Sequence, residues 1–334
     1  PSSTNLAQGA SSTLSTDPFL LITGVYNDAG TRAYAIASDT PGLLRFDVEN
    51  GVYLGTINLT SLQENPEWIV KDPTENTAYL LKSNRIIELD LDTETVVQQN
   101  YLSTAIDPDV AVVDHAGQYL YTDGAVYNQG DLIRIRLSDL SLVSNTRISN
   151  DYSMTTLAVR GDNAEVWTRF FYDIIRINVD VSPFTTDPPI STPTFGYLHS
   201  GPTRAEMYYL GDPGFRVYNE NGALLRTLST PSNYEYGIAD PLGRYFIGAN
   251  RYSHSLFRAD LETNAVSEEL YYYGEHGAVT EDGETIGFFL EDEIFTDGGG
   301  IQQIAPTPLN IVRGEFATIN DAGSIDQVNF YSHA

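Results

Sequence analysis

Hydrophobic and polar positions alternate along this chain in short runs that recur at a spacing of about forty residues. Eight segments share one design, in which a short apolar run leads through a turn rich in Asp, Gly or Pro into a run rich in aromatic and β-branched residues. Such paired runs are typical of β-hairpins. The eight segments begin at Gly24, Ile69, Ala111, Leu157, Tyr197, Gly237, Ala278 and Ala317.

A second pair of alternating runs follows each of the first seven segments, as in "LLRFDVENGVYLGTI" and "IIELDLDTETVVQQNYL". Each unit therefore predicts four antiparallel strands, and no helical period interrupts them. A four-stranded sheet cannot bury both of its faces alone, so repeated sheets of this kind stack around an axis. The sequence predicts an all-β fold, a single β-propeller of four-stranded antiparallel blades.

The number of blades depends on the two ends of the chain. Eight first hairpins but only seven second hairpins occur before Ala334, so one outer hairpin is missing from the count. The stretch "NLAQGASSTLST", Asn5 to Thr16, matches "NENGALLRTLST", Asn219 to Thr230, which is the outer hairpin of the fifth repeat. We therefore expect residues 1–16 to supply the outer strands of the last blade and residues 313–334 its inner strands. Eight blades are the preferred count and seven the alternative, within one domain spanning residues 1–334.

One repeat carries a family resemblance. The stretch "DHAGQYLYTDGAVYNQGDLIRIRLSDLSLV", Asp114 to Val143, resembles the YVTN-type repeat of secreted and surface-layer propellers, which belong with the lactonase-like propellers. The likeness extends over essentially the whole chain, but the motif is structural and degenerate. It implies a propeller fold and an extracellular, cell-surface or periplasmic location, and it does not specify an activity.

Charge and composition exclude several partners. The net charge is −27, from 45 acidic and 18 basic residues, and such a surface repels nucleic acid. No apolar run approaches the length of about eighteen residues that a membrane span needs, so we expect no membrane insertion. The chain begins at Pro1 without a signal-peptide pattern, which indicates a processed or trimmed product. Cysteine is absent, so disulfides and thiolate chemistry are excluded.

Acidic residues recur where the first strand of each predicted blade begins. In propellers of the kind this chain resembles, that strand lines the central channel, so carboxylates at its start would meet at the channel mouth. Hard oxygen ligands suit a divalent cation, with calcium as the candidate ion. The alternative interpretation is that these side chains cap strand ends or reflect an acidic chain. The candidate metal ligands are Glu67, Asp109, Glu235, Glu275 and Glu315.

Aromatic residues fall in segments that the repeat places on the same face as the acidic column. Aromatic planes beside carboxylates bind sugars, and flat tyrosine-rich patches also serve protein contacts; packing between blades is the alternative. The run "RFFYD", Arg169 to Asp173, is expected to be partly exposed, because three consecutive aromatic residues in a strand cannot all point inward. The candidate ligand-binding residues are Trp68, Phe170, Phe171, Tyr172, Tyr234, Tyr236, Tyr252 and Tyr273.

Other catalytic chemistry receives little support. The five histidines are dispersed by the repeat, and no G-x-S-x-G or H-E-x-x-H motif occurs. The stretch "LDLDTET", Leu89 to Thr95, imitates part of a calcium loop, but it falls where every repeat makes its outer turn, so we interpret it as turn chemistry.

The leading hypothesis is a secreted or cell-surface recognition or structural propeller that binds a glycan or protein partner without catalysis, with calcium as a candidate aid. One alternative is a divalent-metal-dependent hydrolase resembling the propeller lactonases, in which the acidic column activates water. A second alternative is a scaffold that self-assembles into a surface layer or filament.

Overall fold

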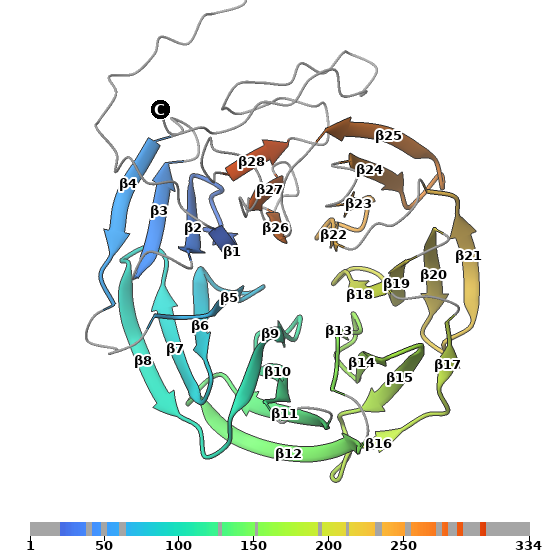
Figure 1. Ribbon diagram of the computed structural model, residues 1–334, viewed down its shortest axis with the longest axis horizontal. Helices are drawn as coiled ribbons and strands as arrows, with labels where there is room; N and C mark the ends of the chain where they lie inside the picture. The colour runs from blue at the N-terminus through green and yellow to red at the C-terminus, as the bar shows by residue number, and fades with distance from the viewer. Residues whose placement is uncertain are drawn as a thin grey trace, which may run out of the picture.

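The computed structural model describes residues 21–37, 42–47, 52–59, 65–125, 129–150, 153–192, 196–211, 214–230, 236–250, 255–271, 276–279, 286–289 and 301–304. Every regular element in these residues is a β-strand, and the sheets are antiparallel, so the predicted all-β class is confirmed. The sheets stand side by side around a common axis in the arrangement of a β-propeller (Figure 1).

The first three blades each contain four strands in sequence order. Blade 1 is formed by β1 (Leu21–Tyr26), β2 (Arg32–Ala37), β3 (Leu43–Asp47) and β4 (Val52–Ile57). Blade 2 is formed by β5 (Trp68–Lys71), β6 (Thr77–Lys82), β7 (Arg85–Asp90) and β8 (Thr95–Tyr101). Blade 3 is formed by β9 (Ile106–Val113), β10 (Tyr119–Gly124), β11 (Gly130–Arg136) and β12 (Ser141–Ser149).

The next three blades vary more at their outer edge. Blade 4 is formed by β13 (Leu157–Val159), β14 (Glu165–Phe170), β15 (Asp173–Asn178), β16 (Thr185–Thr186) and β17 (Ile190–Ser191). Blade 5 is formed by β18 (Gly196–Ser200), β19 (Glu206–Gly211), β20 (Phe215–Asn219) and β21 (Leu224–Leu228). Blade 6 is formed by β22 (Tyr236–Ala239), β23 (Tyr245–Asn250), β24 (Ser255–Asp260) and β25 (Val266–Tyr271).

A three-stranded sheet occupies the sector between blade 6 and blade 1. Its strands are β26 (His276–Val279), β27 (Ile286–Phe289) and β28 (Ile301–Ile304). The innermost strand β26 contacts both β22 and β1, so the ring closes without a further sector (Figure 1).

The expected number of blades is therefore corrected. The described strands form six blades of four or more strands, together with this three-stranded sheet, rather than eight blades or the seven held as the alternative. The direct contact of β26 with β1 leaves no room for an eighth sheet between them. Residues 1–16 and 313–334, which the sequence assigns to the last blade, lie outside the described residues.

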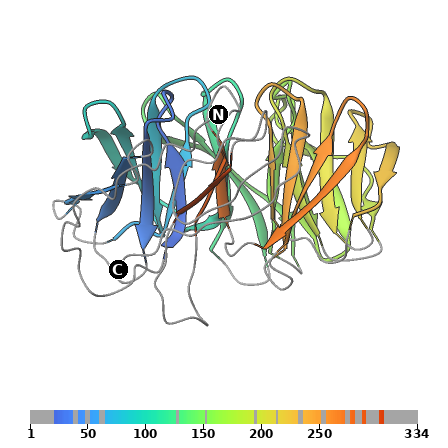
Figure 2. The ribbon, with the colours of Figure 1, turned by 90° about the horizontal axis from the view of Figure 1, so that it is seen from above.

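Packing between blades explains why the second strand of a blade is buried almost along its whole length. In β2, β10, β14 and β19 every residue after the first is buried, because both faces of the sheet are covered by neighbouring blades. Between blades 2 and 3, for example, Leu81 and Ile86 share one hydrophobic cluster with Leu120 and Ile133. Each such fully buried side chain contributes about 1.5–3 kcal/mol to folding. The strands stand roughly along the ring axis in the side view of Figure 2.

Aspartates in the turns form local hydrogen bonds that define the hairpins. After the first strand of blade 3, Asp114 Oδ1 accepts hydrogen bonds from the backbone N–H of Gln118 at 2.7 Å and of Tyr119 at 3.2 Å. In the outer turn of blade 2, Asp90 Oδ1 accepts from the N–H of Asp92 and of Thr93, both at 2.8 Å. These contacts support the interpretation of "LDLDTET" as turn chemistry.

Among the residues described, no helix is long and apolar enough to cross a membrane.

Candidate ligand-binding pocket

The aromatic run of blade 4 forms a tight hairpin turn. Strand β14 ends at Phe170 and β15 begins at its pairing partner Asp173, so Phe171 and Tyr172 form the connection. Phe171 has a φ of 53°, in the left-handed region that costs a non-glycine residue about 1–2 kcal/mol. The surroundings of the turn must therefore hold it in place.

Thr192 provides the main restraint on this turn. Its backbone N–H donates to the carbonyl oxygen of Tyr172 at 2.6 Å, and its Oγ1 donates to the same oxygen at 2.8 Å. Tyr209 of blade 5 donates from its hydroxyl to Thr192 Oγ1 at 3.3 Å. The position of the turn is thus coupled to the joint between blades 4 and 5.

The two aromatic rings of the turn are presented to solvent. Phe171 is 45% exposed and Tyr172 42% exposed, and their ring centroids lie 4.5 Å apart at an interplanar angle of 79°. This edge-to-face geometry is favourable for an aromatic pair and leaves ring surface accessible. Phe170, by contrast, is buried in the cluster that contains Met154 and Leu157. The expectation that "RFFYD" is partly exposed is confirmed.

A pocket of about 410 Å³ lies beside this turn, between the outer strand of blade 3 and blade 4. Its walls come from the end of β12, from the hairpin of β14 and β15, and from the segment that joins β16 to β17. The lining residues are Ile148, Ser149, Phe170, Phe171, Tyr172, Asp173, Ile175, Thr186, Asp187 and Pro189.

The carboxylates of the pocket are held by neighbours. Asp173 Oδ1 accepts a hydrogen bond from Ser191 Oγ at 2.7 Å. Asp187 forms an ion pair with the guanidinium of Arg176, which also donates to the carbonyl oxygen of Glu220 at 3.1 Å. Because Arg176 compensates Asp187, the charge that remains among the lining residues is the carboxylate of Asp173, beside several neutral hydrogen-bonding groups.

A buried arginine lies behind the aromatic turn. Arg169 is 2% exposed, and its Nη1 lies 3.5 Å from Thr155 Oγ1. Burial lowers the pKa of the Arg169 guanidinium, and a hydrogen bond with the hydroxyl of Tyr209 acts in the opposite direction. Tyr209 therefore contacts both Arg169 and Thr192, which connects the turn to the interior of the joint.

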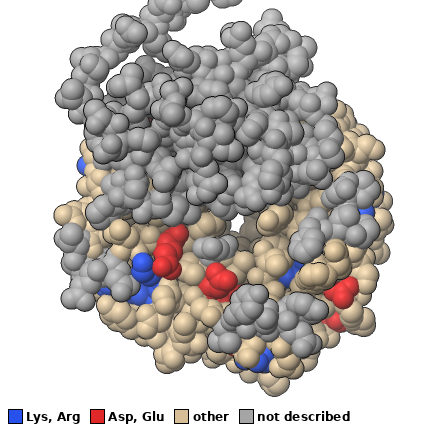
Figure 3. All heavy atoms as spheres, viewed as in Figure 1, with Lys and Arg blue, Asp and Glu red and all other residues tan. Residues whose placement is uncertain are grey.

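Of the five residues of the predicted acidic column, Glu67 alone has a side chain within the described part of the structure. Glu67, directly before β5, pairs with Lys82 Nζ at 3.1 Å and accepts from the N–H of Ser83 at 3.3 Å. Asp109 lies in β9, but its side chain is outside the described residues, as are Glu235, Glu275 and Glu315. Among described residues, no group of three or more Asp, Glu or His side chains could hold a metal ion. The acidic groups visible on the face drawn in Figure 3 are scattered.

Of the other aromatic candidates, Trp68 alone has a described side chain. Trp68 is half-buried and packs against the hydrophobic cluster between blades 2 and 3. Tyr236 begins β22, and its side chain lies outside the described residues, as do Tyr234, Tyr252 and Tyr273. The structure brings Phe170, Phe171 and Tyr172 together.

One irregularity in the sequence marks the remaining pocket residues. The outer segment of the fourth repeat, "VDVSPFTTDPPIST" from Val179 to Thr192, departs from the regular pattern of an alternating strand and an Asp turn. Its prolines cannot donate to a strand ladder, so the outer strand breaks into the two-residue strands β16 and β17. Thr186, Asp187 and Pro189 come from this irregular segment.

Asp123 is a further polar residue that sequence reasoning missed. Its side chain is fully buried at the end of β10 and accepts hydrogen bonds from the N–H of Gly124 at 2.7 Å, of Asp131 at 2.8 Å and of Met154 at 2.7 Å. Burial raises the pKa of the Asp123 carboxyl to about 6, against the effect of these amides, and the charge of Asp107 adds to the rise. Because Met154 lies in the segment that leads from β12 into β13, Asp123 ties the end of β10 to the entry of blade 4.

The propeller fold that the sequence resemblance implies is present. No protein-family model matches this chain. No curated protein is significantly similar to it.

Proposed function

We propose that this protein is a non-catalytic recognition propeller of the cell surface or the secreted fraction, and that it binds a neutral glycan at the pocket beside Phe171 and Tyr172. The observation that carries the proposal is the exposed aromatic pair, held in a strained turn at the mouth of a pocket. A protein partner at the same pocket is the other outcome that the experiment must distinguish.

The chemistry of the pocket suits a sugar. Exposed aromatic rings stack on the C–H faces of a pyranose, while carboxylates and hydroxyls accept and donate hydrogen bonds to its hydroxyl groups. Asp173, Asp187, Ser149 and Thr186 supply such groups around the rings. The volume falls within the range of about 300–1,000 Å³ that is common for small-ligand sites. Compensation of Asp187 by Arg176 favours a neutral ligand.

The test is a glycan array of neutral oligosaccharides probed with the full chain, followed by titration calorimetry with the oligosaccharides that bind. We expect the double variant Phe171→Ala/Tyr172→Ala to lose binding, and the matched variant Tyr101→Ala, which removes an exposed tyrosine from β8, to retain it. At a ligand concentration of about one hundred times Kd, binding should stabilise the fold by about 2.7 kcal/mol. Binding that survives the double variant, or no binding to any array member, would contradict the proposal.

Two other functions stay predictions. The metal-dependent hydrolase needs the acidic column to converge, and Glu67 is engaged with Lys82 in the described part of the chain. Metal analysis of the purified protein, with hydrolysis assays of Glu67→Gln, tests it. The surface-layer scaffold predicts extended assemblies visible by electron microscopy.

A further inference from the structure

A buried carboxylate restrains a segment that packs with the pocket. Asp123, near the end of β10, is fully buried, and its two oxygens accept hydrogen bonds from different parts of the chain. Oδ1 accepts from the N–H of Gly124 and of Asp131, both within blade 3. Oδ2 accepts from the N–H of Met154, in the segment that leads from β12 into β13. Oδ2 is therefore the atom that joins this segment to blade 3.

The segment around Met154 contacts residues that line the pocket. Met154 is buried and shares a hydrophobic cluster with Phe170 and Ile148, two of the lining residues. The next residue, Thr155, donates from its N–H at 3.1 Å and from its Oγ1 at 3.2 Å to the carbonyl oxygen of Arg169, directly before Phe170. A displacement of this segment therefore affects both the start of the aromatic turn and the wall formed by β12.

The charged groups described around Asp123 leave its own charge largely uncompensated. On β9, Asp107 stands opposite Asp123 in the antiparallel pairing and carries a charge of the same sign. On β11, Asp131 forms an ion pair with Arg147 of β12, with Nη2 and Oδ2 at 3.0 Å, so this arginine already has a partner. Residues 153–156 contain no titratable side chain. Burial, with a smaller contribution from Asp107, raises the pKa of the Asp123 carboxyl to about 6, against the effect of the amides.

Protonation changes the two oxygens of Asp123 unequally. A neutral carboxyl has one hydroxyl group, which donates a hydrogen bond and is a weaker acceptor than a charged oxygen. Oδ1 accepts two N–H groups and Oδ2 accepts one, so the proton is placed at lower cost on Oδ2. The hydroxyl then faces the N–H of Met154, and two donors meet. Protonation therefore breaks the bond to Met154 and keeps those to Gly124 and Asp131.

We propose that Asp123 is a proton-sensitive restraint on the pocket, so that the pocket holds its ligand at neutral pH and releases it in acid. The ionised carboxylate keeps Met154 in place, and the neutral carboxyl frees the segment beside Phe170 and Ile148. A ligand that needs the ordered wall binds the ionised form more tightly, and by linkage its binding favours loss of the proton. The inference rests on the proposed function for the existence of a ligand, and it adds how that site is regulated.

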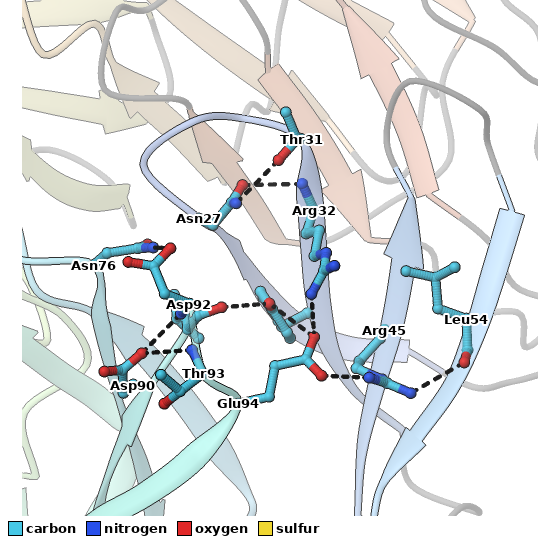
Figure 4. Close-up of polar contacts among 12 residues, drawn as sticks. Asn27, Thr31, Arg32, Arg45, Leu54, Asn76, Asp90, Asp92, Thr93 and Glu94 are labelled. Atoms are coloured by element: carbon cyan, nitrogen blue, oxygen red, sulfur yellow. Dashed lines mark hydrogen bonds and ion pairs between the residues drawn. The ribbon is translucent and has the colours of Figure 1, made fainter.

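Glu94 provides a matched control, because it also connects two blades but takes no part in the pocket. Its carboxylate lies between blades 1 and 2 (Figure 4). Oε1 pairs with Arg32 Nη1 at 2.7 Å and accepts from the Tyr34 hydroxyl at 3.3 Å, and Oε2 pairs with Arg45. None of these residues lines the pocket. Glu94→Gln therefore alters a carboxylate between two blades without affecting the segment at Met154.

The first measurement needs no ligand. Amide hydrogen exchange of the full chain is followed from about pH 7.5 to about pH 5, and each rate is divided by that of an unstructured peptide at the same pH. We expect the protection of the Met154 amide to fall at least about tenfold over this interval, because the carboxyl changes from mostly ionised to mostly neutral. The amides of Gly124 and Asp131 should keep their protection. The same response at all three amides would overturn the proposal.

The second measurement is titration calorimetry over the same pH interval, with an oligosaccharide that binds on the array. We expect the affinity of the native chain to fall about tenfold in acid. Asp123→Asn, which is neutral at every pH, should bind weakly throughout and lose this decline, whereas Glu94→Gln should keep it. An affinity that does not change with pH, or a decline of the same size in Asp123→Asn, would overturn the proposal. If no oligosaccharide binds, the proposed function fails, and the exchange of the Met154 amide still decides whether Asp123 acts as the restraint.

Discussion

The outer hairpin of blade 2 is regular and that of blade 4 is irregular, and the molecular surface beside the two hairpins differs accordingly. In blade 2 the outer strand is continuous, and its polar side chains Gln98 and Asn100 donate to the carbonyl oxygens of Leu137 and Leu140 of blade 3, at 3.2 and 2.9 Å. In blade 4 the outer strand breaks into β16 and β17, and the connecting residues line a pocket instead. The continuous outer strand of blade 2 therefore bonds to the neighbouring blade, whereas the interrupted outer strand of blade 4 leaves space for a pocket.

Two joints of the ring differ in the kind of polar contact that holds them. The joint between blades 1 and 2 is closed by charged side chains at the surface, with Glu94 bound by two arginines of blade 1. The joint between blades 3 and 4 depends on a buried carboxylate, Asp123, that accepts three backbone amides. These two kinds of joint should therefore differ in their response to pH and to substitution.

The largest expected effect is a pH dependence that comes from Asp123. Its pKa in the folded protein is about 6, above the ordinary value of 3.8, because burial disfavours the ionised form. The folded state therefore binds more protons than the unfolded state between these values. Its contribution is greatest below about pH 4 and is lost as the pH rises through 6, by up to about 3 kcal/mol.

Urea unfolding between pH 4 and pH 7 measures this effect. Asp123→Asn should flatten the decline in unfolding free energy over that interval, whatever its effect on absolute stability. Asp139→Asn provides the control, because Asp139 is a surface carboxylate whose pKa is lowered by the hydrogen bonds of Ser141. An unchanged slope in the Asp123 variant would show that the carboxyl does not titrate in this range.

The architecture could be predicted from the sequence because each repeat contains the residue pattern of its own hairpins. Each hairpin depends on features that are local in the sequence: alternating residues in its strands and an Asp-containing turn such as that of Asp90 or Asp114. One chain segment is therefore enough to predict one hairpin. The number of blades depends on how tightly the ring closes, and the contact of β26 with β1 is not encoded in any single repeat.

The candidate site was predicted only in part. The exposure of Phe171 and Tyr172 was predictable from the run of three aromatic residues, although the structure places these two in the hairpin turn and not in a strand. Asp187, which lines the pocket, and Thr192, which holds the aromatic turn, were not, because both come from a segment that departs from the repeat. Asp123 was missed for a related reason, since its partner Met154 lies outside its own repeat, in the segment that connects blades 3 and 4.

A smaller effect is expected from the charged joint. Glu94→Gln should lower the unfolding free energy by about 1–2 kcal/mol, because Arg32 and Arg45 lose a charged acceptor at a partly buried position. Arg136→Gln, which breaks an exposed pair with Asp139, should change it by less than about 0.5 kcal/mol. Equal effects of the two variants on the unfolding free energy would mean that the ion pairs of Glu94 do not stabilise the joint of blades 1 and 2 more than an exposed ion pair does.

The smallest effect on stability, but a clear one on binding, is expected at Thr192. Thr192→Val keeps the backbone N–H that bonds to Tyr172 and removes the hydroxyl that donates to the same oxygen and accepts from Tyr209. The loss should cost about 1 kcal/mol of unfolding free energy, and a looser aromatic turn should weaken the affinity of an oligosaccharide found on the array by about tenfold.

Thr192→Ser retains the hydroxyl and should restore both quantities. Faster amide exchange at residue 192 in the valine variant, but not in the serine variant, would trace the loss to the turn itself and would be visible without any ligand. If exchange at residue 192 and sugar affinity are both unchanged in Thr192→Val, then the irregular outer segment does not position the aromatic pair. In that case the interrupted outer strand of blade 4 would account for the shape of the pocket but not for the position of its aromatic rings.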